Sequence, residues 1–307
     1  MSNPNIKIDE NTKTPIGSHK AIKGQSPFQL AFTRFRKNKG ALIGLIILTL
    51  ITLISIAAPI LIQVDPSATD LYNTSAEPSS EKWLGTNDAG QDVFARLIYG
   101  GRISLLIGFA TMMLTVLIGG TLGALAGYFG KWVDMVIMRL TDVLLTLPTL
   151  LMVLFLVALL ERTNEWILII ALGCTAWAST ARIIRSEFLS LREREFVLGA
   201  KAIGANDFYI IARHMIPNVL APLIVAATLL VANMILVESA LSFLGMGVPP
   251  TTPTWGNMLN EALNMRVIEE QPWLWVPPGI MVVLTVLCIN FIGDGLRDAF
   301  DTKSTRR

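Results

Sequence analysis

The sequence predicts an all-α polytopic membrane protein with six transmembrane helices and both termini in the cytoplasm. Three observations lead to this fold class. The chain has 307 residues, of which 52% are hydrophobic and 16% charged, whereas a soluble domain carries about 25% charged residues. Its apolar residues form long runs, and residues 41–62 contain no ionisable side chain. Basic residues gather in alternate connections between these runs, as the positive-inside rule requires.

The first span is predicted at residues 41–62, because about 20 apolar residues cross the hydrocarbon core as a helix. The run starts well inside the chain and no small-residue cleavage site follows it, so we expect an anchor rather than a signal peptide. Backbone groups in lipid must be satisfied within their own segment, which favours helices over strands. Five further spans are predicted at residues 103–128, 133–160, 166–184, 219–244 and 273–291.

The connections between these spans alternate in charge. Residues 1–40 contain eight lysines and arginines against two acidic residues, whereas residues 63–98 contain six acidic residues against two basic ones. Six basic residues lie between Arg182 and Arg213, and the chain ends on Lys303, Arg306 and Arg307. The sequence therefore predicts that both termini and residues 187–218 are cytoplasmic.

The segments outside the core have distinct expected structures. Residues 1–25 are polar and are expected to form a disordered cytoplasmic tail. Residues 26–40 are expected to form an amphipathic interfacial helix that either anchors on the inner leaflet or braces a neighbouring subunit, with Ser26 as cap and Phe28, Phe32 and Phe35 on one face. The remaining divisions are the first span with its outer loop (41–98), a core that includes the cytoplasmic segment (99–297) and a cytoplasmic tail (298–307).

Residues 195–218, EFVLGAKAIGANDFYIIARHMIPN, are too polar to cross a membrane and too patterned for an irregular loop. We expect a short helix with one apolar face, then a glycine turn, then a second short helix. This arrangement favours docking into a groove of another protein, and the alternative is a pair of helices lying among lipid headgroups. The apolar face is Phe196, Ala200 and Ile203, the break is Gly204, and Asn206 or Asp207 caps the second helix near Phe208.

Charged residues within the predicted spans each need a physical reason, since an unpaired charge in lipid costs about 3 kcal/mol. Arg139 and Asp142 are three residues apart and are expected to form a structural ion pair on one helix face. Glu238 has no such neighbour and is a candidate pore or outer-gate residue, as is Asn233.

Three glycines recur at every fourth position of the second predicted span. Such a stripe lets another helix pack closely, either within the chain or at a subunit interface or moving helix. The sequence leaves these meanings open for Gly119, Gly123 and Gly127.

Motifs for chemistry are missing from the sequence. The Gly130-Lys131 pair is followed by Trp132 rather than the Ser or Thr of a phosphate-binding loop. The two histidines, His19 and His214, are far apart in the sequence and suggest no metal site. We therefore expect no catalytic residue, metal or cofactor in this chain. A membrane enzyme is a remote alternative, and a secondary transporter or channel, which usually shows internal repeats, is the nearer one.

Several stretches carry a resemblance to a known family. Residues 195–218 are similar to the cytoplasmic "EAA" loop of ABC-importer permeases: Gly204 and Pro217 match its Gly and Pro, while Leu198-Gly199-Ala200 stand at its first triplet. The stretches WLGTNDAGQDVFARLIYGGRISL, ESALSFLGMGVPPTTPTWGNML and NFIGDGLRDAFD resemble the C-type permease subunit of dipeptide, oligopeptide and nickel importers.

The resemblance implies a type I ABC-importer permease fold in the inner membrane of a prokaryote. It implies pairing with a second homologous permease, contact with two ATPase subunits that bind ATP and Mg, and delivery of substrate by an extracellular or periplasmic binding protein. The substrate stays open among dipeptides, longer peptides and nickel, and the lack of a Met/His/carboxylate cluster favours peptides. The implied ATPase-coupling residues are Glu195, Phe196, Gly199, Ala200, Ile203, Gly204, Asp207 and Pro217.

Overall fold

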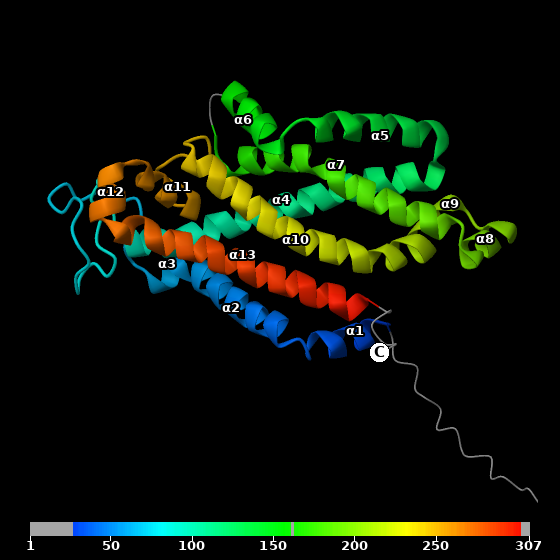
Figure 1. The fold of residues 1–307 in the computed structure, drawn as a ribbon, viewed down its shortest axis with the longest axis horizontal. Helices are drawn as coiled ribbons and strands as arrows, with labels where there is room; N and C mark the ends of the chain where they lie inside the picture. The colour runs from blue at the N-terminus through cyan, green and yellow to red at the C-terminus, as the bar shows by residue number, and fades with distance from the viewer. Residues whose placement is uncertain (1–26, 161–162, 302–307) are drawn as a thin grey trace, which may run out of the picture.

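The computed structural model describes residues 27–160 and 163–301, and these form a bundle of long helices with short helices at its two ends (Figure 1). Their β structure is limited to an isolated bridge between Thr86 and Asp92. The elements are α1 (Pro27–Phe35), α2 (Lys39–Ile56), α3 (Ala58–Leu61), α4 (Val93–Phe129), α5 (Lys131–Thr146), α6 (Thr149–Leu160), α7 (Glu165–Arg192), α8 (Glu195–Ala202), α9 (Asp207–Tyr209), the π-helical turn η1 (Ile210–Met215), α10 (Ile216–Phe243), α11 (Trp255–Asn260), η2 (Glu261–Leu263), α12 (Met265–Glu270) and α13 (Pro272–Phe300).

Five helical segments of the described chain are long and apolar enough to cross a membrane, and a bent pair would make a sixth. The prediction of one continuous third span over residues 133–160 is wrong, because α5 and α6 meet at an angle of 89°. The break lies at Leu147, which is extended with φ −95° and ψ 136°. The following residue, Pro148, disfavours the helical conformation in its predecessor and has no N–H to donate.

Four of the described helices, α4, α7, α10 and α13, are longer than the predicted spans, whereas α2 ends at Ile56, before the predicted end of the first span at residue 62. Asp92 caps α4 by accepting a hydrogen bond from the Ala95 N–H at 2.9 Å, so this helix begins ten residues before residue 103 and contains the expected boundary between residues 98 and 99. Its 37 residues extend about 55 Å at 1.5 Å per residue, well beyond a hydrocarbon core of about 30 Å. Likewise, α13 continues to Phe300, into the predicted tail.

The glycine stripe of α4 packs against α7 within the same chain. A Cβ atom on Gly119, Gly123 or Gly127 would lie 2.5–2.6 Å from an atom of α7, which at Gly123 is the carbonyl oxygen of Ala181. The close approach of the two backbones is possible only because these positions lack side chains. The stripe is therefore a surface for close helix packing within this chain, which is the first of the meanings that the sequence left open.

The amphipathic helix before the first span forms as α1 and lies beside the end of α13 (Figure 1). The Arg34 Nη1 donates to the carbonyl oxygen of Asp301 at 2.9 Å, and Ala31 is buried while Phe32 is exposed. Residues 1–26, with the predicted tail and the Ser26 cap, lie outside the described residues, as do residues 302–307.

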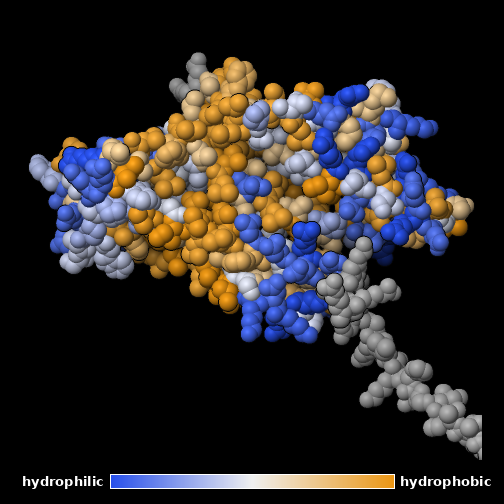
Figure 2. Space-filling view, in the orientation of Figure 1, coloured by the Kyte–Doolittle hydropathy of each residue, from blue (hydrophilic) through white to orange (hydrophobic). Residues whose placement is uncertain are grey.

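Polarity divides the molecule into three zones along its long axis. Figure 2 shows a broad hydrophobic belt between two hydrophilic ends. One end contains α11, α12 and the loop before α4, and the other contains α1, α8, α9 and the end of α13 (Figure 1). The segment 195–218 and both described chain ends thus share one polar end.

Candidate functional site

The segment 195–218 begins with α8, which ends in a complete glycine cap. Gly204 has φ +80°, and its N–H donates to the Lys201 carbonyl while the Ala205 N–H donates to the Ala200 carbonyl, both at 3.0 Å. This pair of bonds is the Schellman motif, which needs the left-handed conformation that glycine adopts without strain. The side chain of Asn206 then caps the next turn by accepting from the Tyr209 N–H at 2.7 Å. The predicted helix and glycine turn are present.

The prediction of a second, separate short helix is wrong. After Asn206 the chain forms α9, the π-turn η1 and α10 without interruption, and the apolar stretch Asp207–Phe243 counts as one helix of 37 residues. In a π-turn the backbone hydrogen bonds join residues five apart rather than four. The turn η1 lies just before Pro217, which has no N–H to donate to the preceding turn. Pro217 is therefore the second residue of α10, inside a continuous helix.

The apolar face of α8 differs from the predicted one. Val197 and Ala200 are buried in a cluster with Tyr128, Phe188 and Met215. Ala200 therefore packs against its own chain, and its prediction as a docking residue is wrong. Positions 197 and 200 are three apart and share one helix face. Exposed apolar residues lie on the other sides, with Ile203 86% and Phe208 80% exposed, followed by Leu198 and Phe196.

The remaining predicted coupling residues differ in what surrounds them. Glu195 is exposed in the first turn of α8, where a carboxylate complements the helix dipole. A Cβ atom on Gly199 would meet no heavy atom of the described chain within 4 Å, so this side of α8 is open. Asp207 is exposed, but its carboxylate is bound to the bundle, since its Oδ1 accepts a hydrogen bond from the hydroxyl of Tyr128 at 2.5 Å.

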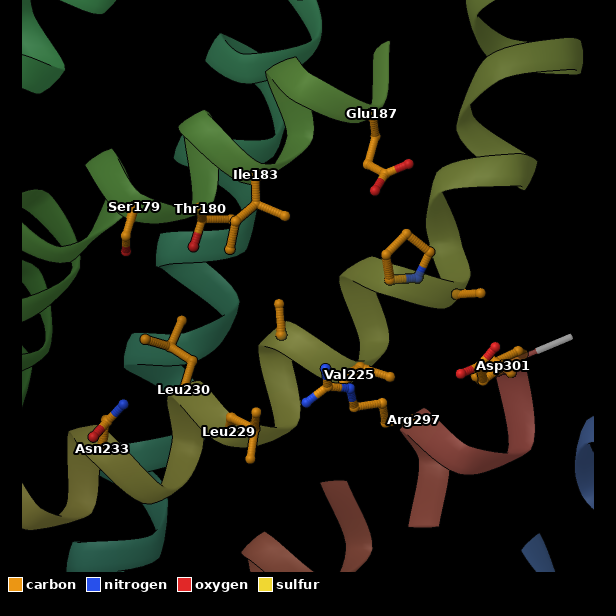
Figure 3. Close-up of a pocket in the computed structure, with 14 residues that line it drawn as sticks. Ser179, Thr180, Ile183, Glu187, Val225, Leu229, Leu230, Asn233, Arg297 and Asp301 are labelled. Atoms are coloured by element: carbon orange, nitrogen blue, oxygen red, sulfur yellow. The ribbon is translucent and has the colours of Figure 1, made fainter. Parts of the chain in front are cut away.

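A cavity of about 850 Å³ opens between α7, α10 and α13 near the same polar end (Figure 3). Glu187 on α7 and Arg297 on α13 reach it from different walls, and Asn233 on α10 lies at its far end (Figure 3). The wall between them is mainly apolar, with Ile183, Val225, Leu229 and Leu230. The structure thus places Asn233 at a cavity, where its amide can bind a polar group.

Glu238 does not line this cavity. Its side chain is fully buried and accepts hydrogen bonds from the hydroxyl of Ser242 at 2.9 Å and that of Ser104 on α4 at 3.2 Å. A buried carboxyl needs such donors, and the donors occupy the space through which it could have faced a pore. The prediction of a pore-lining Glu238 is therefore wrong. Ser242 stands at i+4 in the sequence, so this partner could have been recognised beforehand.

Glu238 belongs to a polar cluster that holds α11 in the bundle. The Ser104 hydroxyl oxygen also accepts from the Trp255 N–H at 3.2 Å, and the Trp255 indole donates to the Leu97 carbonyl at 3.0 Å. Trp255 itself is fully buried. The cluster joins α4, α10 and α11 at the polar end opposite to α8, so a role of Glu238 at an outer gate stays a prediction.

The ion pair predicted between Arg139 and Asp142 is wrong. Asp142 accepts from Arg182 of α7 at 2.9 Å, and the ion pairs of the described residues do not include Arg139. A basic residue that precedes its acidic partner on a helix opposes the helix dipole, which makes this order the weaker one. About two turns nearer the start of α5, Asp134 binds Arg185 through two bonds, of which the Nη2–Oδ2 bond measures 2.6 Å.

A second cavity, of about 490 Å³ and with a polar wall, lies at the end opposite to α8. Its wall includes Asn87, whose amide donates to Glu261 at 3.0 Å. Burial raises the pKa of Glu261, and the hydrogen bond from Asn87 and the charge of Arg96 act in the other direction. Among the described residues no three His, Cys, Asp or Glu side chains are grouped to hold a metal ion.

Two models of known protein families match parts of this chain. A family model described as the binding-protein-dependent transport system inner membrane component matches residues 119–306, which include the segment 195–218 and the wall of the larger cavity. The chain belongs to this family. A second model, described as the N-terminal TM domain of oligopeptide transport permease C, matches residues 26–78, which include α1 and α2.

Similar proteins cover nearly the whole of this inner membrane component. It is 41% identical to the dipeptide transport system permease protein of Alkalihalophilus pseudofirmus, over 98% of this chain and 97% of the relative. The oligopeptide transport system permease proteins of Bacillus subtilis and Escherichia coli are 39% and 41% identical, with 92% of this chain and 91% and 93% of those proteins covered. The predicted resemblance to the C-type permeases of peptide importers is thus confirmed.

Proposed function

We propose that this chain is the permease subunit of an ATP-driven peptide importer in the inner membrane of a bacterium. It forms half of the translocation pathway beside a second, homologous permease, crosses the membrane six times with both termini in the cytoplasm, and receives peptides from a binding protein on the outer face. Two partner ATPase subunits bind ATP and Mg and hydrolyse the ATP. The names of the similar proteins support peptides as the substrate class.

One observation carries the proposal that the segment 195–218 couples this chain to an ATPase. At a hydrophilic end of the molecule, α8 and the turn after it expose Leu198, Ile203 and Phe208 while Val197 and Ala200 fix α8 to the bundle. A rigid helix with a large exposed apolar edge suits a groove on a partner protein. The docking edge is defined here as Phe196, Leu198, Ile203 and Phe208.

The covalent connections of α8 give this docking edge a mechanical role. Through Leu191–Arg194 the segment follows α7, and through η1 it continues into α10, and these two helices form walls of the larger cavity. A displacement of α8 by closing ATPases therefore moves two walls of the cavity. Asn233, Glu187 and Arg297 then lie on the proposed path of the peptide.

The test is a substitution at the most exposed apolar residue of the docking edge. Ile203→Asp puts a charge where the partner groove excludes water, whereas Ile203→Leu keeps the side chain apolar and serves as the matched control. With the complete transporter purified by a tag on this chain, we expect Ile203→Asp to lower the retained ATPase subunits about tenfold, equivalent to about 1.4 kcal/mol. Equal retention by both variants would contradict docking at this edge.

A further inference from the structure

One side chain outside the segment 195–218 contacts the segment on both sides of the Gly204 turn. Tyr128 is the second-last residue of α4, and its hydroxyl donates to Asp207 Oδ1 at 2.5 Å. The ammonium of Lys201, on α8, lies 4.8 Å from the centre of the Tyr128 ring, a distance at which a cation is attracted to an aromatic face. The residues before and after the Gly204 turn are thus both held by Tyr128.

The end of α7, just before the segment, is held at the same place. The Arg192 guanidinium, at the end of α7, donates from Nη1 to the carbonyl oxygen of Tyr128 at 3.4 Å. The Tyr128 ring is buried in the cluster that contains Val197 and Ala200 of α8. The hydroxyl and the ring of this residue therefore contact the segment 195–218, and its backbone carbonyl contacts the end of α7, which precedes the segment.

Tyr128 matters because α4 has no direct covalent connection to the segment. The segment continues into α7 on one side and α10 on the other, whereas α4 is separated from it in the chain by α5, α6 and α7. Any movement of α8 must therefore reach α4 through non-covalent contacts. The close packing of Gly119 and Gly123 against α7 then spreads such a movement along the bundle.

We propose that Tyr128 is a positioning residue of the importer, and that its hydrogen bond to Asp207 transmits the movement of the coupling segment to α4. This inference rests on the proposed function. It assigns to the end of α4 a part in energy coupling, although Tyr128 lies outside the docking edge and outside the cavity wall.

The experiment compares variants in the complete transporter, reconstituted with its ATPases, its second permease and its binding protein. Tyr128→Phe removes the hydroxyl but keeps the ring, Asp207→Ala removes the acceptor, and Asp207→Asn keeps an oxygen that can accept. The measured quantity is peptide taken up per ATP hydrolysed. We expect Tyr128→Phe and Asp207→Ala each to lower this ratio about three- to tenfold, the range of one hydrogen bond. Asp207→Asn should restore most of the ratio.

The double variant makes the test specific for the pair. If the two groups act through one bond, Tyr128→Phe with Asp207→Ala lowers the ratio no further than either substitution alone. The matched control is Tyr99→Phe, which removes a hydroxyl of the same helix that donates to the Ile62 carbonyl at 3.3 Å near the opposite end. We expect this control to keep the wild-type ratio.

Two outcomes would overturn the inference: an unchanged ratio in Tyr128→Phe, or a double variant in which the two losses multiply. A failure of the proposed function is separately visible, because the wild-type complex would then show no peptide-stimulated ATP hydrolysis at all. Retention of the ATPase subunits by Tyr128→Phe, measured on the same tag, separates lost transmission from lost assembly.

Discussion

At the scale of single residues, the shape of the segment 195–218 depends on the backbone of Gly204. Its φ of +80° permits the two hydrogen bonds that close α8, and a Cβ atom at this position would meet no heavy atom of the described chain within 4 Å. A substitution here therefore acts on backbone conformation rather than on packing. Branched side chains disfavour positive φ most, whereas asparagine tolerates it.

The first prediction at this scale concerns Gly204→Val. We expect about 1–3 kcal/mol of local strain or a rearranged turn, with a marked loss of peptide-stimulated ATP hydrolysis in the assembled transporter. The variant should still insert in the membrane, because the substitution lies outside the helices that could span it. Gly204→Asn is the control and should stay close to the wild type. Stimulation that survives in the valine variant would show that the angle set by this turn is unimportant.

At the scale of helices, α4 and α7 form the most closely packed pair in the bundle through the glycine stripe. The neighbouring helix α5 is attached to α7 by the pairs Asp134–Arg185 and Asp142–Arg182. The pair Asp142–Arg182 is about half exposed at both side chains, so its contribution in water would be small.

The prediction for helix packing uses two glycines of the same helix. In Gly123→Val the new Cβ would lie 2.5 Å from the Ala181 carbonyl oxygen, whereas at Gly120 it would meet no described atom within 4 Å. We expect Gly123→Val to force α4 from α7, to destabilise the chain by about 1–3 kcal/mol, and to lower the thermal midpoint of the purified protein. Gly120→Val serves as the control for helix propensity. Equal midpoints for the two variants would contradict this packing.

At the scale of the whole molecule, the hydrophobic belt and its two hydrophilic ends indicate how the chain lies in a bilayer (Figure 2). The end with α1 and α8 contains the basic residues of the segment 195–218, and the positive-inside rule places such an end in the cytoplasm. We therefore propose that the end with α11 and α12 faces the outer side.

The prediction for the whole molecule is a labelling pattern in intact cells or spheroplasts. The two native cysteines, Cys174 and Cys288, are free thiols and are first replaced by alanine. New cysteines at Tyr72 and Leu263, both well exposed at the outer end, should react with an impermeant maleimide. A cysteine at the exposed Ala202 on α8 should react only after the membrane is permeabilised. Labelling of Ala202→Cys without permeabilisation would invert the topology and remove the coupling role of α8.

The sequence by itself determined the fold class, the apolar segments, the position of the glycine turn and the family. These features depend on local chemistry: a run of apolar residues, a break at Gly204, or a set of adjacent motifs is present in the chain before it folds. The α1 helix and the Asn206 cap follow from the same kind of signal. The first helix of the segment 195–218 and its glycine turn could be predicted for that reason, whereas the face that α8 exposes could not.

Only the tertiary structure decided which surface each residue faces and which groups pair. Ala200 and Ile203 belong to one short helix, but the cluster around Tyr128 buries the first and leaves the second in solvent. Asp142 pairs with Arg182 because α5 lies against α7, forty residues further along the chain. Glu238 finds Ser104 on another helix for the same reason. Contacts between helices depend on how their surfaces fit together, and that fit is a property of the folded bundle rather than of any one segment.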